Sequence, residues 1–197
     1  MFDYNKRTYI MGILNVTPDS FSDGGKFNSV DEALKYAIKM VEEGADIIDL
    51  GGESTRPGHI YVDVDYVDVD EELKRVIPVV KKLKEELDTP ISVDTYKAKV
   101  ADESLKLGAE MINDIWGLRK DKDMANVIAK HNAYVCIMHN QDDTEYDKDI
   151  MESIKEFLLE SVDIAIEAGI DKNKIVLDPG IGFGKTYEQN LEVLKRL

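Results

Sequence analysis

The sequence predicts an α/β fold built from pairs of one β-strand and one α-helix. Six short apolar runs alternate with longer segments of helical periodicity, and glycines close several of these segments. Strict alternation implies parallel strands with right-handed crossovers, as in an open doubly wound sheet or a (β/α) barrel. A full barrel has eight units in roughly 250 residues. Six units in 197 residues fit a barrel that lacks its last two units, and they also fit an open sheet.

The first two units have clear patterns. The apolar run 8–14 predicts a strand, and residues 30–43 predict an amphipathic helix that ends at Gly44. The run 46–50 predicts the second strand, and residues 71–87 predict the second helix. Between them, the pentapeptide YVDVD occurs twice in succession, at 61–65 and 66–70. We interpret this duplication as a solvated surface loop.

Four further units follow the same pattern. Strands are predicted at 91–94, 110–114, 133–138 and 174–177, and helices at 97–107, 124–131, 150–168 and 187–197. Among these helices, 124–131 has the weakest pattern. No stretch rich in Pro, Gly or Ser divides the chain, so we expect one domain over residues 1–197.

Composition excludes several classes of partner. The net charge of −15 argues against nucleic acid or an anionic membrane surface as the main partner. No apolar run approaches the length of a membrane span, and residues 1–7 are polar and are not followed by the apolar core of a signal peptide. The lone cysteine, Cys136, lies inside an apolar run, which predicts a buried strand thiol and a reducing compartment. We therefore expect a cytoplasmic protein.

Polar residues follow nearly every predicted strand. In a parallel barrel such positions converge on the mouth at the carboxyl ends of the strands, where active sites are built. One acidic residue at a strand end is often only a helix cap, but six successive strands with polar ends indicate a ligand site. In chain order these residues are Asn15, Glu53, Thr55, Arg56, Asp94, Asn113, Asp114, His139 and Asp178.

Three of these residues suit a particular ligand. Asp94 and Asp178 provide carboxylate acceptors, and Asn113 provides an amide that both donates and accepts. This set complements the edge of an aminopyrimidinone, which presents N–H donors beside a carbonyl acceptor. An analogue without a donor would leave a carboxylate unpaired, so the site would discriminate strongly.

Six motifs resemble those of dihydropteroate synthases. ILNVTPDSFSDGG (13–25) and DLGGESTRPG (49–58) are similar to the two signature loops of that family. ISVDT, INDIWG, IMHN and LDPGIGFGK follow in the family's order, and the likeness covers the whole chain. The resemblance implies a TIM-type (β/α)8 barrel, of which about six units are present here. Corrinoid methyltransferases that bind methyltetrahydrofolate share the barrel and the Asp/Asn/Asp set but lack the first loop.

The resemblance also implies an activity. Dihydropteroate synthases are transferases that condense 6-hydroxymethyl-7,8-dihydropterin diphosphate with p-aminobenzoate in folate biosynthesis, releasing diphosphate with the help of Mg²⁺. The family also implies a homodimer for the full-length enzyme.

The roles carried over residue by residue are of three kinds. Asp94, Asn113 and Asp178 would bind the pterin, and Asn15 would ligate Mg²⁺ or contact the diphosphate. Phe21, Thr55, Arg56, Phe183 and Lys185 would contact p-aminobenzoate or diphosphate. Asp94, Asp23 and Arg56 would act in catalysis, with Asp23 and Phe21 closing over p-aminobenzoate. We expect His139 to support Asp178 or Asn113.

The chain departs from the family after Leu197. Two further units would follow there, with a Ser-Arg-Lys motif and an Arg/His pair that contact the substrates. We therefore expect negligible synthase activity from these 197 residues alone. The alternatives are a non-catalytic pterin-binding fragment and a methyltetrahydrofolate-dependent corrinoid methyltransferase.

Overall fold

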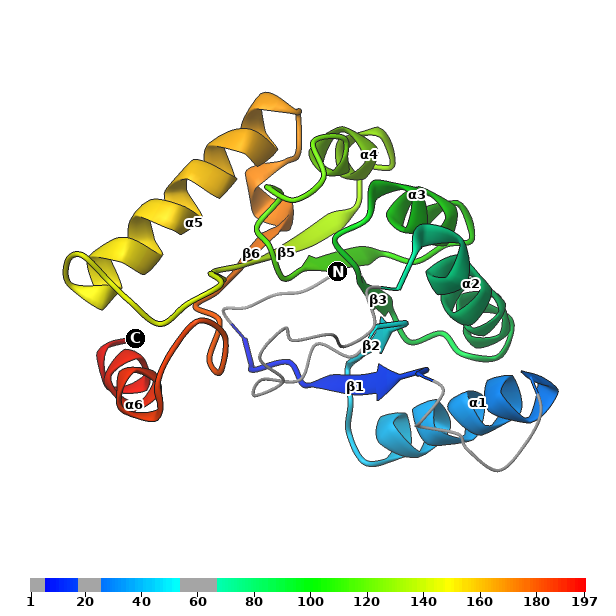
Figure 1. Ribbon diagram of the computed structural model, residues 1–197. Coiled ribbons are helices and arrows are strands. Elements are labelled where there is room, and N and C mark those ends of the chain that lie inside the picture. The colour runs from blue at the N-terminus through cyan, green and yellow to red at the C-terminus, as the bar shows by residue number, and fades with distance from the viewer. Residues whose placement is uncertain (1–5, 18–25, 54–66) are drawn as a thin grey trace.

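The computed structural model describes residues 6–17, 26–53 and 67–197. Six parallel strands form one sheet in the order β1-β2-β3-β4-β5-β6, so each strand pairs with its neighbours in sequence. The sheet curves, and the helices lie around its outer side (Figure 1). A doubly wound sheet reverses its strand order at a switch point. The consecutive order therefore excludes the open doubly wound alternative and is that of a barrel wall.

All twelve predicted elements are present, most of them with shifted ends. The first strand begins at Met11 rather than at residue 8, and the first helix begins at Lys26 rather than at residue 30. The strands are β1 (Met11–Asn15), β2 (Ile47–Gly51), β3 (Ile91–Asp94), β4 (Met111–Asp114), β5 (Tyr134–Met138) and β6 (Ile175–Asp178). The helices are α1 (Lys26–Glu42), α2 (Val69–Glu86), α3 (Ala98–Lys106), α4 (Met124–Lys130), α5 (Ile150–Glu167) and α6 (Tyr187–Arg196), with a short 3-10 helix at Lys172–Lys174.

Local chemistry explains several helix ends. The Asp68 side chain accepts a hydrogen bond from the N–H of Glu71 and begins α2, and Asp149 does the same for α5. Thr186 and Gln189 form a reciprocal capping box at the start of α6. Gly44 has a φ of +110°, which allows the chain to turn after α1.

The second YVDVD copy is wrongly interpreted as a solvated loop. Its Val67 is buried, its Asp68 caps α2, and its last two residues are the first two of that helix. The first copy lies outside the described residues. The second copy of the repeat therefore forms the start of α2.

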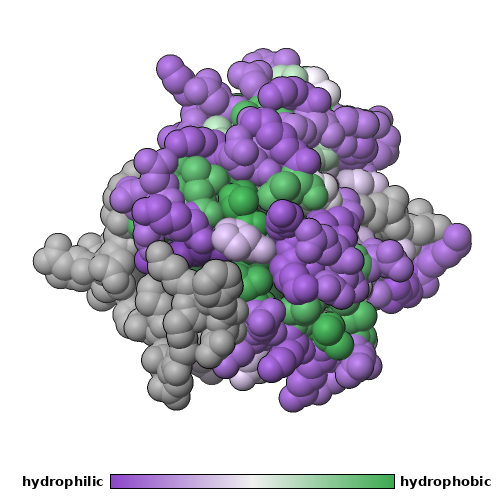
Figure 2. Space-filling view, turned by 90° about the vertical axis from the view of Figure 1, so that its right-hand side faces the viewer, coloured by the Kyte–Doolittle hydropathy of each residue, from purple (hydrophilic) through white to green (hydrophobic). Residues whose placement is uncertain are grey.

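The two faces of the sheet differ in chemistry. The outer face packs Ile48, Leu50, Val93, Ile112 and Ile137 against the helices in one large apolar core. The inner face has only a small apolar cluster around Ile47, Met111 and Cys136. Hydrophilic residues cover most of the molecular side that carries α1 and α2, with apolar patches between them (Figure 2).

The edge strands leave apolar side chains uncovered. Ile13 on β1 is 65% exposed and Leu177 on β6 is 50% exposed. Within the described part of the chain, β1 pairs only with β2 and β6 only with β5. None of the described helices is long and apolar enough to cross a membrane.

Candidate active site

The strand register places three predicted site residues and one glycine in one row across the sheet. Asn15 pairs with Gly51, Gly51 with Asp94, and Asp94 with Asn113. These positions lie at the carboxyl ends of β1 to β4, on the inner face. The expectation that Asp94 and Asn113 are neighbours is confirmed.

Gly51 leaves space between two polar side chains. A Cβ atom built on Gly51 would lie 2.9 Å from Oδ1 of Asn15 and 3.6 Å from Oδ2 of Asp94. The amide oxygen of Asn15 and the carboxylate of Asp94 therefore both border the space above this glycine. Amide and carboxylate oxygens are the ligands that Mg²⁺ prefers, usually together with substrate phosphate oxygens.

Asn113 is held by a buried acid that the sequence analysis missed. Nδ2 of Asn113 donates to Oδ2 of Asp49 at 2.9 Å, and burial raises the pKa of Asp49. Among the described residues, Oδ1 of Asn113 and Oδ1 of Asp49 are buried and have no hydrogen-bond partner. Buried acceptors without partners are costly, and a ligand with N–H donors would satisfy them.

The position of Asp49 in the sequence hid its role. It lies inside the apolar run 46–50 and not at its end, so it was counted as part of the strand. The period of two places Asp49 on the same face as Ile47 and Gly51, and that face turns inward. An inward acid two residues before a site glycine is the signal that could have found it.

Asp178 ends β6 beside Met138 of β5. Its Oδ1 accepts a hydrogen bond from the N–H of Gly180 at 2.7 Å, so the carboxylate is oriented by the glycine-rich loop that follows. On the inner face, Cys136 of β5 lies between Asn113 of β4 and Val176 of β6. Burial, and then the charges of Asp178, Asp49 and Asp94, raise the pKa of its thiol. The prediction of a buried strand thiol is confirmed.

The loop after β6 is tightly packed on β5. Gly180 has a φ of +70°, and a Cβ there would lie 1.9 Å from the carbonyl oxygen of His139. Only glycine fits this approach. Further along the loop, the hydroxyl of Tyr146 donates to the carbonyl of Gly184 at 2.8 Å.

Lys185 has partners other than the substrate anion that the resemblance implied. Its side chain is buried, and its ammonium contacts Nδ1 of His139 at 3.0 Å. It also donates to the carbonyl oxygens of Gly180 and Phe183, each at 2.8 Å. An ammonium has three N–H donors, and these three acceptors use all of them.

His139 supports this loop rather than the side chains expected for it. Its ring stacks on Tyr146 at 6.2 Å and meets the edge of Phe157 at 5.0 Å. Burial, and then the charge of Lys185, lower the pKa of His139 to about 4. Its contact with the Asp178 region is through the backbone, where its N–H donates to the carbonyl of Asp178.

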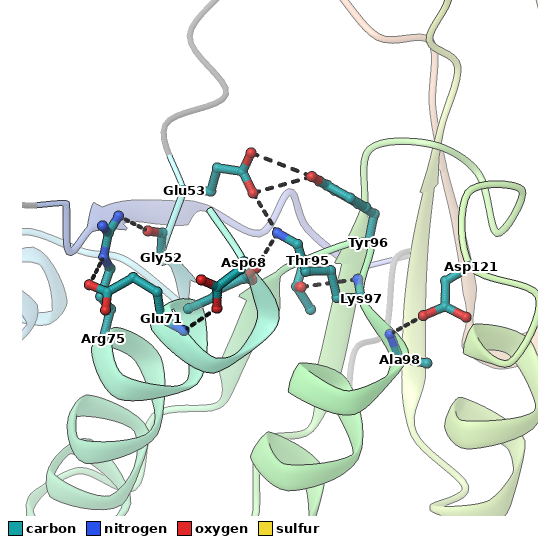
Figure 3. Close-up of polar contacts among 11 residues, drawn as sticks. Gly52, Glu53, Asp68, Glu71, Arg75, Thr95, Tyr96, Lys97, Ala98 and Asp121 are labelled. Carbon is teal, nitrogen blue, oxygen red and sulfur yellow. Dashed lines mark hydrogen bonds and ion pairs between the residues drawn. The ribbon is translucent and has the colours of Figure 1, made fainter. Parts of the chain in front are cut away.

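Two other polar residues near strand ends, Asp114 and Glu53, make hydrogen bonds that stabilise the fold. Asp114 accepts from the N–H groups of Trp116 and Leu118, and burial raises its pKa to about 6. Glu53 accepts from Lys97 Nζ at 2.6 Å and from the hydroxyl of Tyr96 (Figure 3). These contacts show why a polar residue at a strand end is not by itself a site residue.

Lys97 joins the ends of β2 and α2. Besides Glu53, its Nζ contacts Oε2 of Glu72 at 2.5 Å, and Glu72 is only 1% exposed. Arg75 of α2 also donates to the carbonyl of Gly52 at 3.1 Å (Figure 3). The ammonium and the guanidinium thus fix the described residues on both sides of 54–66.

Comparison with known proteins identifies the family. Residues 11–197 match the family model described as pterin binding enzyme. The chain is 58% identical to the dihydropteroate synthase of Clostridium beijerinckii over 196 residues, which are 100% of this chain and 71% of that protein. It is 55% identical to the dihydropteroate synthase of Bacillus subtilis, over 98% of this chain and 66% of that protein. The chain belongs to the dihydropteroate synthase family of pterin-binding enzymes.

Solved structures of dihydropteroate synthases agree with this fold. One, from Clostridium difficile in the presence of pteroic acid, is 71% identical with a TM-score of 0.94, covering 100% of this chain and 73% of that one. Another, from Xanthomonas albilineans with 4-aminobenzoic acid, is 43% identical with a TM-score of 0.88, covering 96% and 67%. The chain thus spans about two thirds of the length of its relatives.

Four of the residues predicted from the dihydropteroate synthase motifs lie outside the described part of the chain. They are Phe21, Asp23, Thr55 and Arg56. Within the described part, no three His, Cys, Asp or Glu side chains form a group that could hold a metal ion.

Proposed function

We propose that this chain supplies the pterin-binding wall of a dihydropteroate synthase. The activity of that synthase would be the condensation of 6-hydroxymethyl-7,8-dihydropterin diphosphate with p-aminobenzoate, with release of diphosphate. The observation that carries the proposal is the set of buried acceptors without partners at Asn113 and Asp49, next to Asp94. An aminopyrimidinone edge provides the N–H donors that such acceptors require.

In this proposal the protein works mainly by electrostatics and position. The bond between the pterin methylene carbon and the diphosphate oxygen breaks, and the electron pair leaves with diphosphate. The Asp94 carboxylate stabilises the positive charge that develops on the pterin. The amine of p-aminobenzoate then attacks the methylene carbon and loses a proton to solvent. No nucleophilic side chain is needed.

The remaining residues keep the roles that the family resemblance assigns. Asn113 and Asp178 hold the pterin edge, and Asn15 contributes an oxygen ligand to Mg²⁺ beside the diphosphate. When bound, Mg²⁺ would offset the charge of the leaving diphosphate. Phe183 would border p-aminobenzoate, as would Phe21 and Asp23, while Thr55 and Arg56 would contact the diphosphate. A homodimer and a cytoplasmic location are further proposals from the same resemblance.

Calorimetric titration of this chain with the pterin diphosphate and Mg²⁺ tests the proposal. We expect binding that Asp94→Asn weakens by about tenfold or more, because a carboxylate bound to N–H donors is replaced by an amide. Asp163→Asn, a change of the same kind at an exposed position of α5, is the matched control and should leave affinity unchanged. Absence of binding by a folded chain, or equal affinity of Asp94→Asn and the unmodified chain, would reject this site.

A further inference from the structure

The loop after β6 contains a buried cation whose hydrogen bonds are all internal. Lys185 is 8% exposed, and its three N–H donors face three acceptors at 2.8 to 3.0 Å. One acceptor is His139, which follows β5, and the other two belong to the glycine-rich loop itself. A charge in this environment is retained only where its partners are complete.

His139 is in the form that this arrangement requires. Lys185 can only donate, so Nδ1 of His139 must accept, and the ring proton lies on Nε2. The low pKa of His139, about 4, keeps the ring neutral at physiological pH. Tyr146 and Phe157 fix the plane of this ring. Two aromatic rings therefore pack against the acceptor of Lys185.

The other two acceptors, the carbonyl oxygens of Gly180 and Phe183, connect Lys185 with the residues proposed to contact the two substrates. The peptide groups of Gly180 link Lys185 to Asp178, because the Gly180 N–H donates to Oδ1 of Asp178 and its carbonyl accepts from Lys185. The carbonyl of Phe183 accepts from the same ammonium, and its N–H donates to the carbonyl of Gly180 at 3.1 Å. One ammonium therefore connects the carboxylate of Asp178 with the backbone of Phe183.

We propose that Lys185 is a positioning residue that sets Asp178 and Phe183 in one fixed geometry for the two substrates. This inference rests on the proposed function, since Asp178 is assigned to the pterin and Phe183 to p-aminobenzoate. Lys185 acts through the loop backbone and does not touch a substrate. A direct contact with an anion would require a free donor, and all three are occupied.

Hydrogen exchange and binding, measured on the same variants, test the proposal. Lys185→Met keeps the length and the apolar stem but removes all donors, whereas Lys185→Arg keeps charge and donors. Lys155→Met, at an exposed position of α5, is the matched control. In Lys185→Met we expect the amides of Gly180 and Phe183 to exchange about tenfold faster or more, while those of the core residues Val93 and Ile112 stay unchanged.

Binding should follow the same order. The dissociation constant for the pterin diphosphate with Mg²⁺ should rise about tenfold in Lys185→Met, recover in part in Lys185→Arg, and stay constant in Lys155→Met. Unchanged exchange at Gly180 and Phe183 in Lys185→Met would overturn the proposal. So would a uniform acceleration that includes Val93 and Ile112, because that describes general destabilisation.

One measurement needs no variant and remains decisive if Lys185→Met does not fold. Nitrogen-15 NMR of the unmodified chain should show Nδ1 of His139 unprotonated and Nε2 protonated. A proton on Nδ1 would exclude the hydrogen bond from Lys185 and overturn the proposal. If the unmodified chain binds no pterin, the proposed function fails, and exchange at Gly180 and Phe183 alone decides whether Lys185 positions the loop.

Discussion

Replacing Gly51 by alanine should separate binding of the diphosphate from folding. The added Cβ would lie 2.9 Å from Oδ1 of Asn15 and 3.6 Å from Oδ2 of Asp94. The first distance is about 0.5 Å shorter than an ordinary carbon–oxygen contact, whereas the second is an ordinary contact. The Asn15 side chain must therefore move away, while Asp94 can stay in place.

The expected magnitudes differ for stability and for binding. Gly51 lies in a regular strand, and a change from glycine to alanine there removes freedom from the unfolded chain, worth roughly 0.4–1 kcal/mol. This gain offsets part of the cost of displacing Asn15, so the free energy of unfolding should change by less than about 1 kcal/mol. The Mg²⁺-dependent part of the affinity should fall about tenfold or more, because the oxygen ligand proposed at Asn15 would be displaced.

Calorimetric titrations with the pterin diphosphate, with and without Mg²⁺, measure this effect. The corresponding pterin alcohol serves as a ligand without diphosphate, and its affinity for Gly51→Ala should stay near that of the unmodified chain. Gly12→Ala is the matched control on the outer face of β1, where a Cβ would meet Met40 Sδ at 3.0 Å and Ala45 Cβ at 3.3 Å. Equal gains from Mg²⁺ in Gly51→Ala and Gly12→Ala would refute the role given to Asn15.

Three further predictions concern buried ionisable side chains. Lys97→Met leaves Glu72, which is 1% exposed, without its cation, so the free energy of unfolding in urea should fall by about 3–5 kcal/mol, and Lys97→Met with Glu72→Gln should recover most of it. Burial raises the pKa of Asp114 from 3.8 to about 6, so its proton stabilises the fold below about pH 4, and this contribution is lost as the pH rises through 6. The carboxyl carbon of Asp114 should titrate near pH 6 by NMR, and a midpoint near 4 would contradict the burial argument. His139, with a pKa of about 4, should show no protonation midpoint of its ring between pH 5 and 7, and a midpoint near 6.5 would contradict its neutral state.

The secondary structure could be predicted because it depends on short-range patterns. In the described part of the chain, apolar runs and helical periodicity located the strands and the α-helices but not the short 3-10 helix, and glycines such as Gly44 marked helix ends. The strand order could not be predicted from periodicity, because a sheet wound in one direction and a doubly wound sheet share the same alternation. The family motifs resolved this question in the sequence, and the consecutive strand order resolves it in the structure.

The candidate site could be predicted where strand ends alone define it. Asp94 and Asn113 are register partners because they lie near the carboxyl ends of neighbouring parallel strands. Asp49 was missed because it lies inside an apolar run, and the structure shows that its face of β2 turns inward. The roles of Lys185 and Lys97 depend on acceptors more than 40 residues away in sequence, His139 and Glu53, so only the tertiary fold shows whether each lysine faces a ligand or supports the fold.

The inner face of the sheet also restricts the kind of ligand that fits. In the row that begins with Asn15, the side chains are polar as far as Asn113 and become apolar at Cys136 and Val176. At the next inward position of β6, Asp178 adds a carboxylate beyond the apolar part. A flat heterocycle has an apolar face and a polar edge, so it can contact both halves of this row at once. A ligand that is polar all round, such as a sugar phosphate, would gain no apolar contact with Cys136 and Val176, and this row therefore favours a pterin over such ligands.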